Sequence, residues 1–178
     1  MTTEIILVRH ATSSHQAPEA PLTAAGIAQA QALAELLDTL DIARIVSSPL
    51  RRAVQTAEPF SARSGLSIEL DPRLSERRLS GSDLPDWRAH LRASFIDLDR
   101  CLEGGESARD ARMRGLAVID EAVATGRRTV LVTHGTLLAL LLGAFDPSIG
   151  YEVWDRLSIP DVYIVQTRAG TLRRIWNG

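Results

Sequence analysis

Near its N-terminus the chain reads IILVRHAT at residues 5–12. Four consecutive apolar residues followed at once by charged ones are typical of a short strand that is fully buried in a sheet. In a parallel sheet, ligands bind in the crevice beyond the carboxyl ends of the strands. Arg9 and His10 are therefore expected at the mouth of a sheet, where packing alone does not call for a guanidinium or an imidazole.

A second strand end has the same form. Residues 130–136 read VLVTHGT, so that a hydrophobic strand is again followed by a histidine, a very small residue and a threonine. His10 and His134 lie far apart in the sequence, but they can meet if their two strands are neighbours in one sheet. Either histidine alone is explained equally well as a strand cap that bonds the backbone. Together, the two favour a shared functional site.

Composition limits the class of protein. A length of 178 residues predicts one domain over residues 1–178, and a hydrophobic content of 45% is ordinary for a globular chain. The formal net charge of −2 argues against a dedicated nucleic-acid binder. Because Cys101 is the single cysteine, internal disulfides and cysteine-rich zinc sites are excluded, and we expect a reducing, cytoplasmic setting.

No membrane or export segment is expected. The N-terminal apolar run is short and begins directly after Glu4, which does not fit a signal peptide. The longest uncharged stretch, Thr129 to Phe145, is interrupted by a histidine and falls short of the roughly 20 apolar residues that a membrane span needs. It is predicted to be a buried strand followed by a buried helix from about residue 136 to 142.

Strands and helices are predicted to alternate along the first half of the chain. Thr23 is expected to cap a helix whose apolar stripe contains Ile27 and Leu37. Ser48 and Pro49 predict the start of a second helix, which runs to about residue 63. Further strands are expected at residues 42–47 and 66–70. This alternation predicts an α/β fold, a three-layer α/β/α sandwich with a mostly parallel central sheet.

The second half adds a covering segment and an antiparallel edge. Apolar residues at helical spacing between Leu84 and Leu98 predict a helix inside a segment, about residues 73–105, that covers the mouth of the sheet. Ser107 and Asp110 predict a capped helix that Gly126 ends. Residues 162–166 and 171–176 are expected to form an antiparallel hairpin at the sheet edge.

Five segments, taken in order, resemble the histidine phosphatase superfamily, which is also called phosphoglycerate mutase-like. They read RHAT at 9–12, PLTAAGIAQA at 21–30, SSPLRRAVQTA at 47–57, LSER at 74–77 and VTHG at 132–135. Two departures are notable. Ala11 replaces the usual glycine, and the aromatic-glycine pair common after the acidic residue is missing.

The resemblance implies a phosphatase that works through a phosphohistidine intermediate and needs no metal or cofactor. It implies that His10 is the nucleophile, that Glu76 is the general acid and that His134 holds the phosphoryl oxygens. Arg9 and one arginine of the second helix can supply forked donors to phosphate. Spacing does not choose between Arg51 and Arg52, whereas the resemblance selects Arg52.

The remaining predicted residues surround this centre. By resemblance, Gln16 stands where many members have an asparagine near the phosphate, and Gly135 belongs to the segment of the second histidine. The arginines between residues 73 and 105 suggest an anionic substrate, although solvated surface charge explains most of them as well. Helix capping likewise explains the acidic residue after Gly104 and Gly105. The candidate residues of the substrate rim are Arg77, Arg78, His15, His90 and Glu106.

The leading hypothesis is a phosphomonoesterase that acts on a small anionic phosphorylated metabolite and releases inorganic phosphate. We expect no nucleic-acid or membrane partner, and a monomer or a homodimer. Three alternatives stay open: a phosphoglycerate mutase, a protein phosphohistidine phosphatase, and a catalytically silent phosphate-binding module. The last usually lacks a residue that the chemistry needs, and none is missing here.

Overall fold

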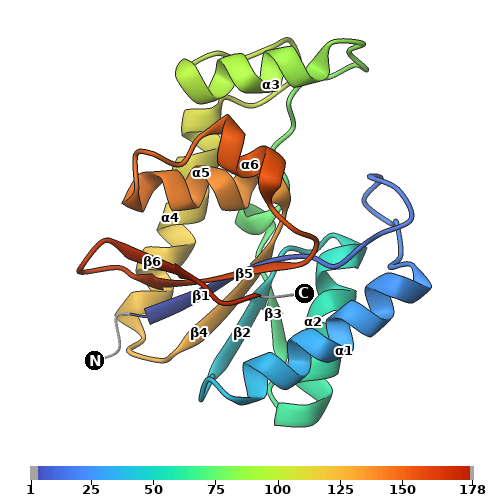
Figure 1. The fold of residues 1–178 in the computed structure, drawn as a ribbon, viewed down its shortest axis with the longest axis vertical. Coiled ribbons are helices and arrows are strands. Elements are labelled where there is room, and N and C mark those ends of the chain that lie inside the picture. The colour runs from blue at the N-terminus through green and yellow to red at the C-terminus, as the bar shows by residue number, and fades with distance from the viewer. Residues whose placement is uncertain (1–3, 177–178) are drawn as a thin grey trace.

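The computed structural model describes residues 4–176 and is built around a mixed sheet (Figure 1). Within these residues the sheet has six strands in the order β3-β2-β4-β1-β5-β6. The first four pair in parallel, whereas β5 runs antiparallel to β1 and β6 antiparallel to β5. The predicted parallel sheet with an antiparallel edge is confirmed. The strands are β1 (Glu4–Arg9), β2 (Arg44–Ser47), β3 (Ile68–Leu70), β4 (Thr129–Thr133), β5 (Asp161–Gln166) and β6 (Thr171–Arg174).

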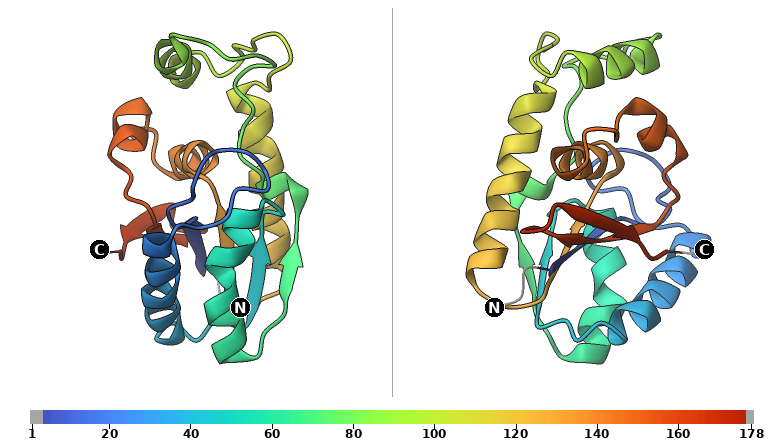
Figure 2. Two further views of the ribbon diagram at one scale, coloured as in Figure 1. Left: turned by 90° about the vertical axis from the view of Figure 1, so that its right-hand side faces the viewer. Right: turned by 60° about the vertical axis from the view of Figure 1, so that its left-hand side comes forward.

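Helices cover both faces of the sheet, as the predicted three-layer sandwich requires. Helices α1 and α2 lie on one face, while α4 and α5 lie on the other (Figure 2). Helix α3 stands apart from the sheet, beyond α6 (Figure 1). The helices are α1 (Ala24–Asp38), α2 (Arg51–Ser64), α3 (Trp87–Ile96), α4 (Ala108–Ala124), α5 (Gly135–Phe145) and α6 (Tyr151–Arg156), with a short 3-10 turn at Pro72–Leu74.

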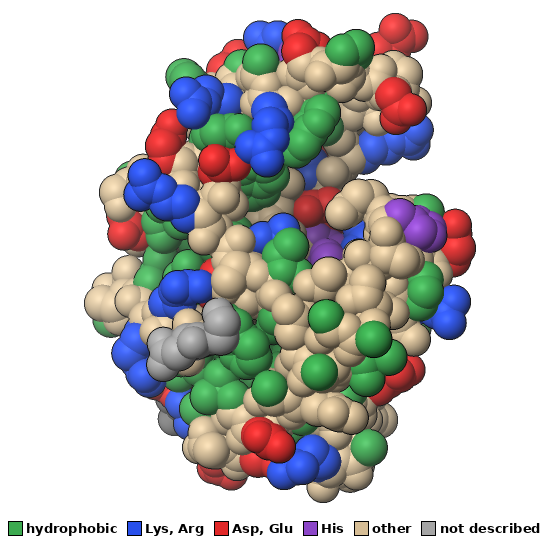
Figure 3. All heavy atoms as spheres, turned by 45° about the vertical axis from the view of Figure 1, so that its right-hand side comes forward, with side chains coloured by type: hydrophobic (Ala, Val, Ile, Leu, Met, Phe, Trp, Pro, Cys, Tyr) green, Lys and Arg blue, Asp and Glu red, His purple; other side chains and the backbone are tan. Residues whose placement is uncertain are grey.

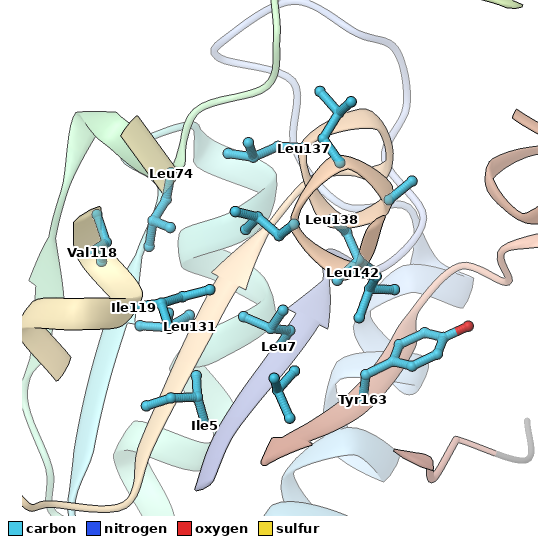
Figure 4. Close-up of a cluster of buried hydrophobic side chains, with 14 of the residues drawn as sticks. Ile5, Leu7, Leu74, Val118, Ile119, Leu131, Leu137, Leu138, Leu142 and Tyr163 are labelled. Carbon is cyan, nitrogen blue, oxygen red and sulfur yellow. The ribbon is translucent and has the colours of Figure 1, made fainter. Parts of the chain in front are cut away.

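Alternating side chains of the strands fill two separate cores. Ile5 and Leu7 of β1 point into the core under α4 and α5 (Figure 4), while Ile6 and Val8 point into the core under α1 and α2. All four are almost completely buried. Because successive side chains of a strand face opposite sides, a strand covered on both sides must be continuously apolar. This is why the run before Arg9 contains no polar residue.

The register of the two central strands positions the site. Strands β1 and β4 are parallel neighbours in which Arg9 pairs with Thr133. The pairing continues one residue further, where the backbone N–H of His10 donates to the carbonyl oxygen of Thr133 at 2.9 Å. His10 and His134 therefore leave the sheet side by side at the same edge.

Two helix starts follow the sequence prediction and one does not. Thr23 accepts a hydrogen bond from the Gly26 N–H at 3.0 Å, and Ser107 accepts one from the Asp110 N–H at 3.0 Å. Helix α2, however, begins at Arg51 after an extended Leu50, not at Pro49. The prediction of a Ser48 cap was wrong at this helix: the Ser48 hydroxyl accepts from the Leu50 N–H at 3.3 Å, before the helix begins, and also contacts a distant side chain.

Two other expectations also differ from the structure. Ile27 is 51% exposed, and Gly26 is buried in its place. A Cβ at Gly26 would lie 2.0 Å from the carbonyl oxygen of Thr12, so only glycine lets α1 approach this loop. Helix α6 lies between residues 142 and 162, a stretch in which the sequence predicted no helix or strand. Its six residues are too few to show a helical period.

The covering segment stays close to α6. Trp87 of α3 meets Trp154 of α6 edge to face, with ring centroids 6.1 Å apart. Arg88 of α3 forms an ion pair with Asp155 of α6 at 2.7 Å. Among the described residues, no helix has the length and apolar character to cross a membrane.

Candidate functional site

A cavity of about 510 Å³ opens beyond the carboxyl ends of β1 and β4. Figure 3 shows the hollow, with histidine, basic and acidic side chains visible inside it. Its walls come from five places: the end of β1, the loop that follows β1, the covering segment, the start of α5 and the region of α6. The lining residues are Arg9, Gln16, Glu76, Arg77, Leu79, Trp87, Arg88, Leu91, Gly135, Thr136, Trp154, Asp155, Leu157 and Ile159.

His10 follows the cavity-lining Arg9 at the end of β1, is almost completely buried and is neutral. Burial lowers the pKa of His10 to about 4, and the nearby positive charges of Arg52 and Arg9 act in the same direction. Its Nδ1 lies 2.7 Å from the carbonyl oxygen of Ala11. Since a carbonyl only accepts, Nδ1 must carry the proton, and Nε2 keeps a free lone pair. The ring is thus held in the tautomer that a nucleophile needs.

Arg52 faces that lone pair. Its Nε donates to His10 Nε2 at 3.2 Å, and one terminal nitrogen donates to the carbonyl oxygens of Gln16 and Ala17 at 3.2 and 3.0 Å. Only 2% of the residue is exposed. Burial lowers the pKa of Arg52, but a guanidinium stays charged in proteins. A fixed cation therefore stands beside the nucleophilic nitrogen.

Arg9 supplies a second fixed cation. It lines the cavity, and one terminal nitrogen donates to the carbonyl oxygens of Leu157 and Ser158 at 3.0 and 3.3 Å. Its buried Nε has no hydrogen-bond partner among the described residues. Burial lowers the pKa of Arg9, while the carboxylates of Glu76 and Asp161 act to raise it.

His134 meets His10 directly, as the two strand ends predicted. The ring centroids lie 5.0 Å apart at an angle of 61°. Its Nε2 lies 2.7 Å from the Ser48 hydroxyl, and its buried Nδ1 has no protein partner within residues 4–176. Complete burial, helped by the charges of His10 and Arg52, lowers the pKa of His134 well below its usual value.

Glu76 is held by the start of α5. Its two carboxylate oxygens accept three backbone hydrogen bonds, from Thr136 at 2.9 Å, Leu137 at 3.0 Å and Arg77 at 2.8 Å. The first N–H groups of a helix lack internal partners and carry partial positive charge, so a carboxylate fits there. Glu76 thus closes the N-terminus of α5 and lines the cavity at the same time.

Gly135 and Gln16, which the resemblance assigns to phosphate binding, also line the cavity. A Cβ at Gly135 would lie 3.0 Å from Cζ of Arg9 and 3.1 Å from its Nε. The glycine therefore leaves the space that the Arg9 guanidinium occupies. Gln16 also supplies a backbone oxygen to Arg52.

The predicted rim divides into one residue that lines the cavity and four that do not. Arg77 is buried, and it donates to the Glu106 carbonyl oxygen at 3.0 Å and to the Ser94 hydroxyl at 2.6 Å. The other four have partners elsewhere. These are Ser80 for Arg78, Ala17 for His15, Asp86 and Arg100 for His90, and Arg114 for the Glu106 side chain.

Sequence reasoning missed residues that position or enclose this centre. The Ser48 hydroxyl contacts His134, although its sequence context predicted only a helix cap. Thr56 of α2 accepts a hydrogen bond from the Ala11 N–H at 2.9 Å and ties α2 to the strand end. Trp154, Leu157 and Ile159 line the cavity from a region in which the sequence predicted no helix or strand. The aromatic pair Tyr151 and Trp154, three residues apart, was the one available signal.

The described residues contain no group of three or more histidine, cysteine or acidic side chains that could hold a metal ion. The arrangement instead offers a neutral imidazole with a free lone pair, one buried and one half-buried guanidinium group, a second imidazole and a carboxylate. Forked guanidinium donors match the oxygens of a tetrahedral phosphoryl group. This set suits phosphoryl transfer, in which positioning and fixed charge supply most of the catalysis.

Comparison with known proteins agrees with this chemistry. The sequence model of the histidine phosphatase superfamily (branch 1) matches residues 5–171. The chain belongs to the histidine phosphatase superfamily. This confirms the resemblance seen in the five segments, and with it the expected class of reaction, phosphomonoester hydrolysis in a family that uses a phosphohistidine intermediate.

The chain is similar both to members of the superfamily named as phosphatases and to one named as a mutase. The chain is 33% identical over 168 residues to glucosyl-3-phosphoglycerate phosphatase of Mycolicibacterium vanbaalenii, covering 79% of this chain and 72% of that protein. It is 31% identical over 156 residues to a protein of Enterobacter sp. named probable phosphoglycerate mutase GpmB, covering 78% and 73%. It also resembles the solved complex of a mycobacterial glucosyl-3-phosphoglycerate phosphatase with inorganic phosphate, with a TM-score of 0.75, 28% identity and coverage of 98% and 97%.

Proposed function

We propose that the protein hydrolyses the phosphate monoester of a small anionic metabolite, with Nε2 of His10 as the atom that takes up the phosphoryl group. One observation carries this assignment. The Ala11 carbonyl fixes the proton on Nδ1, so the lone pair of Nε2 points toward the buried Arg52 guanidinium. A structural histidine would not need its free lone pair aimed at a fixed cation.

In the first step the substrate phosphate lies between Arg9, Arg52 and His134. It replaces His10 Nε2 as the partner of Arg52 Nε and gains the free Nδ1 of His134 and Nε of Arg9. The Nε2 lone pair then forms a bond to phosphorus while the phosphorus–oxygen bond to the alcohol breaks. The departing oxygen takes a proton from Glu76, which acts as general acid.

In the second step water takes the place of the alcohol. Glu76, now a carboxylate, accepts a proton from this water, whose oxygen attacks phosphorus and breaks the phosphorus–nitrogen bond. Inorganic phosphate and neutral His10 result. The three N–H donors around Glu76 match this carboxylate state. Oε2 accepts only one of these three bonds, so it keeps a lone pair that can carry the proton of the general-acid step.

The decisive experiment compares the wild type with His10→Ala on an aryl phosphate and maps the phosphorylated residue after rapid quenching. We expect an acid-labile phosphoryl group on the peptide that contains His10, and almost complete loss of turnover in the variant. Turnover that survives the substitution, or a phosphoryl group on another peptide, would contradict the proposal.

A second candidate function is phosphoglycerate mutase activity, favoured by the name of the Enterobacter relative. In a mutase the phosphoryl group returns to a hydroxyl of the bound acid and not to water. Two assays separate the candidates: release of inorganic phosphate from 3-phosphoglycerate, and its conversion to 2-phosphoglycerate with and without 2,3-bisphosphoglycerate. We expect hydrolysis without stimulation by the bisphosphate.

The wider setting completes the proposal. The protein works in the cytoplasm as a single domain over residues 1–178, a monomer or a homodimer, with neither nucleic acid nor membrane as partner. The single cysteine and the net charge of −2 support this setting.

The segment at residues 73–105 serves as a lid over the substrate, which the contact of Trp87 with Trp154 supports. No cofactor enters the reaction, since nucleophile, acid and phosphate donors all come from the chain.

A further inference from the structure

The outer part of the cavity differs in chemistry from its floor. Polar groups surround the phosphate position, whereas the surrounding walls carry six apolar side chains, contributed by the lid, α6 and the loop that follows α6. These are Leu79, Trp87, Leu91, Trp154, Leu157 and Ile159. Trp87 is 42% exposed even though it belongs to this wall. Apolar surface left open inside a cavity is surface that a ligand can cover.

The charged residues of this outer part are already paired. Arg88 bonds Asp155 at 2.7 Å, and its guanidinium lies 5.1 Å and 5.7 Å from the ring centroids of Trp87 and Trp154. Arg77, the other arginine of the lid that lines the cavity, donates to the Glu106 carbonyl oxygen and to the Ser94 hydroxyl. The outer wall therefore has few free hydrogen-bonding groups to offer to the hydroxyls of a sugar or a polyol.

The volume of the cavity also favours a substrate with a bulky apolar group. Cavities that hold drug-sized ligands measure about 300 to 1,000 Å³. At about 510 Å³, this cavity has room for a phosphate and for an organic group larger than a three-carbon acid. A large flat group fits two indole rings that meet edge to face, because aromatic rings pack favourably in offset or edge-to-face contacts.

We propose that the preferred substrate is a phosphate monoester of an alcohol that carries an aromatic ring, with the ring packed against Trp87 and Trp154. This inference rests on the proposed function and specifies its substrate class. The ring enters where the lid and α6 meet, and the phosphate reaches Arg9 at the floor. Binding energy from the ring then positions the phosphorus against His10, and specificity comes from contacts remote from the reacting bond.

The test compares two primary-alcohol phosphates, because phenols would leave faster for purely chemical reasons. These are 3-phenylpropyl phosphate and glycerol 3-phosphate. We expect kcat/KM of the wild type to be about tenfold or more higher for the phenylpropyl ester, mainly through a lower KM. Trp87→Ala should remove most of this preference, because it should lower kcat/KM far more for the phenylpropyl ester than for glycerol 3-phosphate, while Trp87→Phe retains the preference.

Ile96→Ala provides the matched control, since Ile96 lies on the same helix, is 84% exposed and does not line the cavity. It should leave both esters unaffected. Equal or better hydrolysis of glycerol 3-phosphate that depends on His10 would overturn the inference and leave the proposed function standing. An equal loss on both esters in Trp87→Ala would also overturn it. If neither ester is hydrolysed in a His10-dependent way, the proposed function fails together with the inference.

Discussion

The ends of β1 and β4 have the same sequence pattern, but their histidines are held in opposite ways. His10 bonds the Ala11 carbonyl through Nδ1 and presents Nε2 to Arg52. His134 contacts Ser48 through Nε2 and leaves Nδ1 without a protein partner within residues 4–176. The difference comes from the residues that surround each ring and not from the local motif. One pattern thus holds two imidazoles differently, and we propose one as the nucleophile and the other as a phosphoryl-binding group.

Removing each imidazole in turn gives the largest effect. With an aryl phosphate, His10→Ala should abolish phosphoenzyme formation, whereas His134→Ala should slow turnover by about 10²- to 10³-fold, as expected for loss of one donor to the transition state. Phosphoryl labelling after rapid quenching should still find His10 modified in the His134 variant. Labelling of His134 in the His10 variant would show that the two rings are interchangeable.

The contact between Ser48 and His134 tests the comparison of the two histidines through a smaller expected effect on kcat. Ser48→Ala removes the partner of His134 Nε2 and leaves a buried polar atom unpaired, so kcat should fall about tenfold. The neighbouring Ser47 is equally buried and bonds only the backbone of Ser48. Ser47→Ala should keep kcat near that of the wild type. Equal losses in both variants would mean that the hydroxyl has only a structural role.

The residue after each histidine differs as well, alanine at position 11 and glycine at position 135. Gly135→Ala places a methyl group 3.0 Å from the Arg9 guanidinium and should lower kcat/KM about fivefold by displacing it. Gly115→Ala is the matched control, because its Cβ would crowd the Leu141 side chain at 2.8 Å, between α4 and α5. It should lower the melting temperature without changing kcat/KM. An unchanged kcat/KM in the Gly135 variant would contradict the role given to Arg9.

The smallest change is expected from pH alone. Since the pKa of His10 is lowered to about 4, its ring should stay neutral from pH 8 to pH 5 in an NMR titration of the imidazole nitrogens. Below pH 6.5 the unfolded chain binds more protons at both histidines than the folded chain does. The free energy of unfolding should therefore decrease as pH falls from 6.5 toward 4, and recover as pH rises. Protonation of His10 near pH 6.5 would remove the basis for a neutral nucleophile.

The sequence predicts the centre of this site better than its walls. His10, His134 and Arg9 follow from strand ends, because the sheet itself brings such residues to one edge. Arg52 could be chosen over Arg51 only through the family resemblance, since the spacing of the helix allows either arginine to face the site. Ser48 and Trp154 could not be assigned from local patterns. Their contacts depend on how α2 and α6 approach the sheet. Helix α6 is also too short to show a helical period in the sequence.

The elements of the fold likewise divide into those that local sequence patterns predict and those that depend on packing between elements. Residues 5–8 and 130–132 are continuously apolar, so the place of β1 and β4 in the middle of the sheet could be predicted from pattern alone. The start of α2 could not, because the capping signal of Ser48 and Pro49 is overridden when the serine turns toward His134. Ile27 shows the same limit, since the close approach of Gly26 to Thr12 rotates the buried face of α1.

The central place of β1 has a consequence for how the molecule is made. Strand β1 is translated well before both of its neighbours, since Arg9 pairs with Thr133 on one side and with Asp161 on the other. A nascent chain therefore cannot complete the cavity at the end of β1 before β4 and β5 have been translated. Such distant pairings slow folding. An anion that binds only the finished pocket then favours the completed molecule over every truncated intermediate.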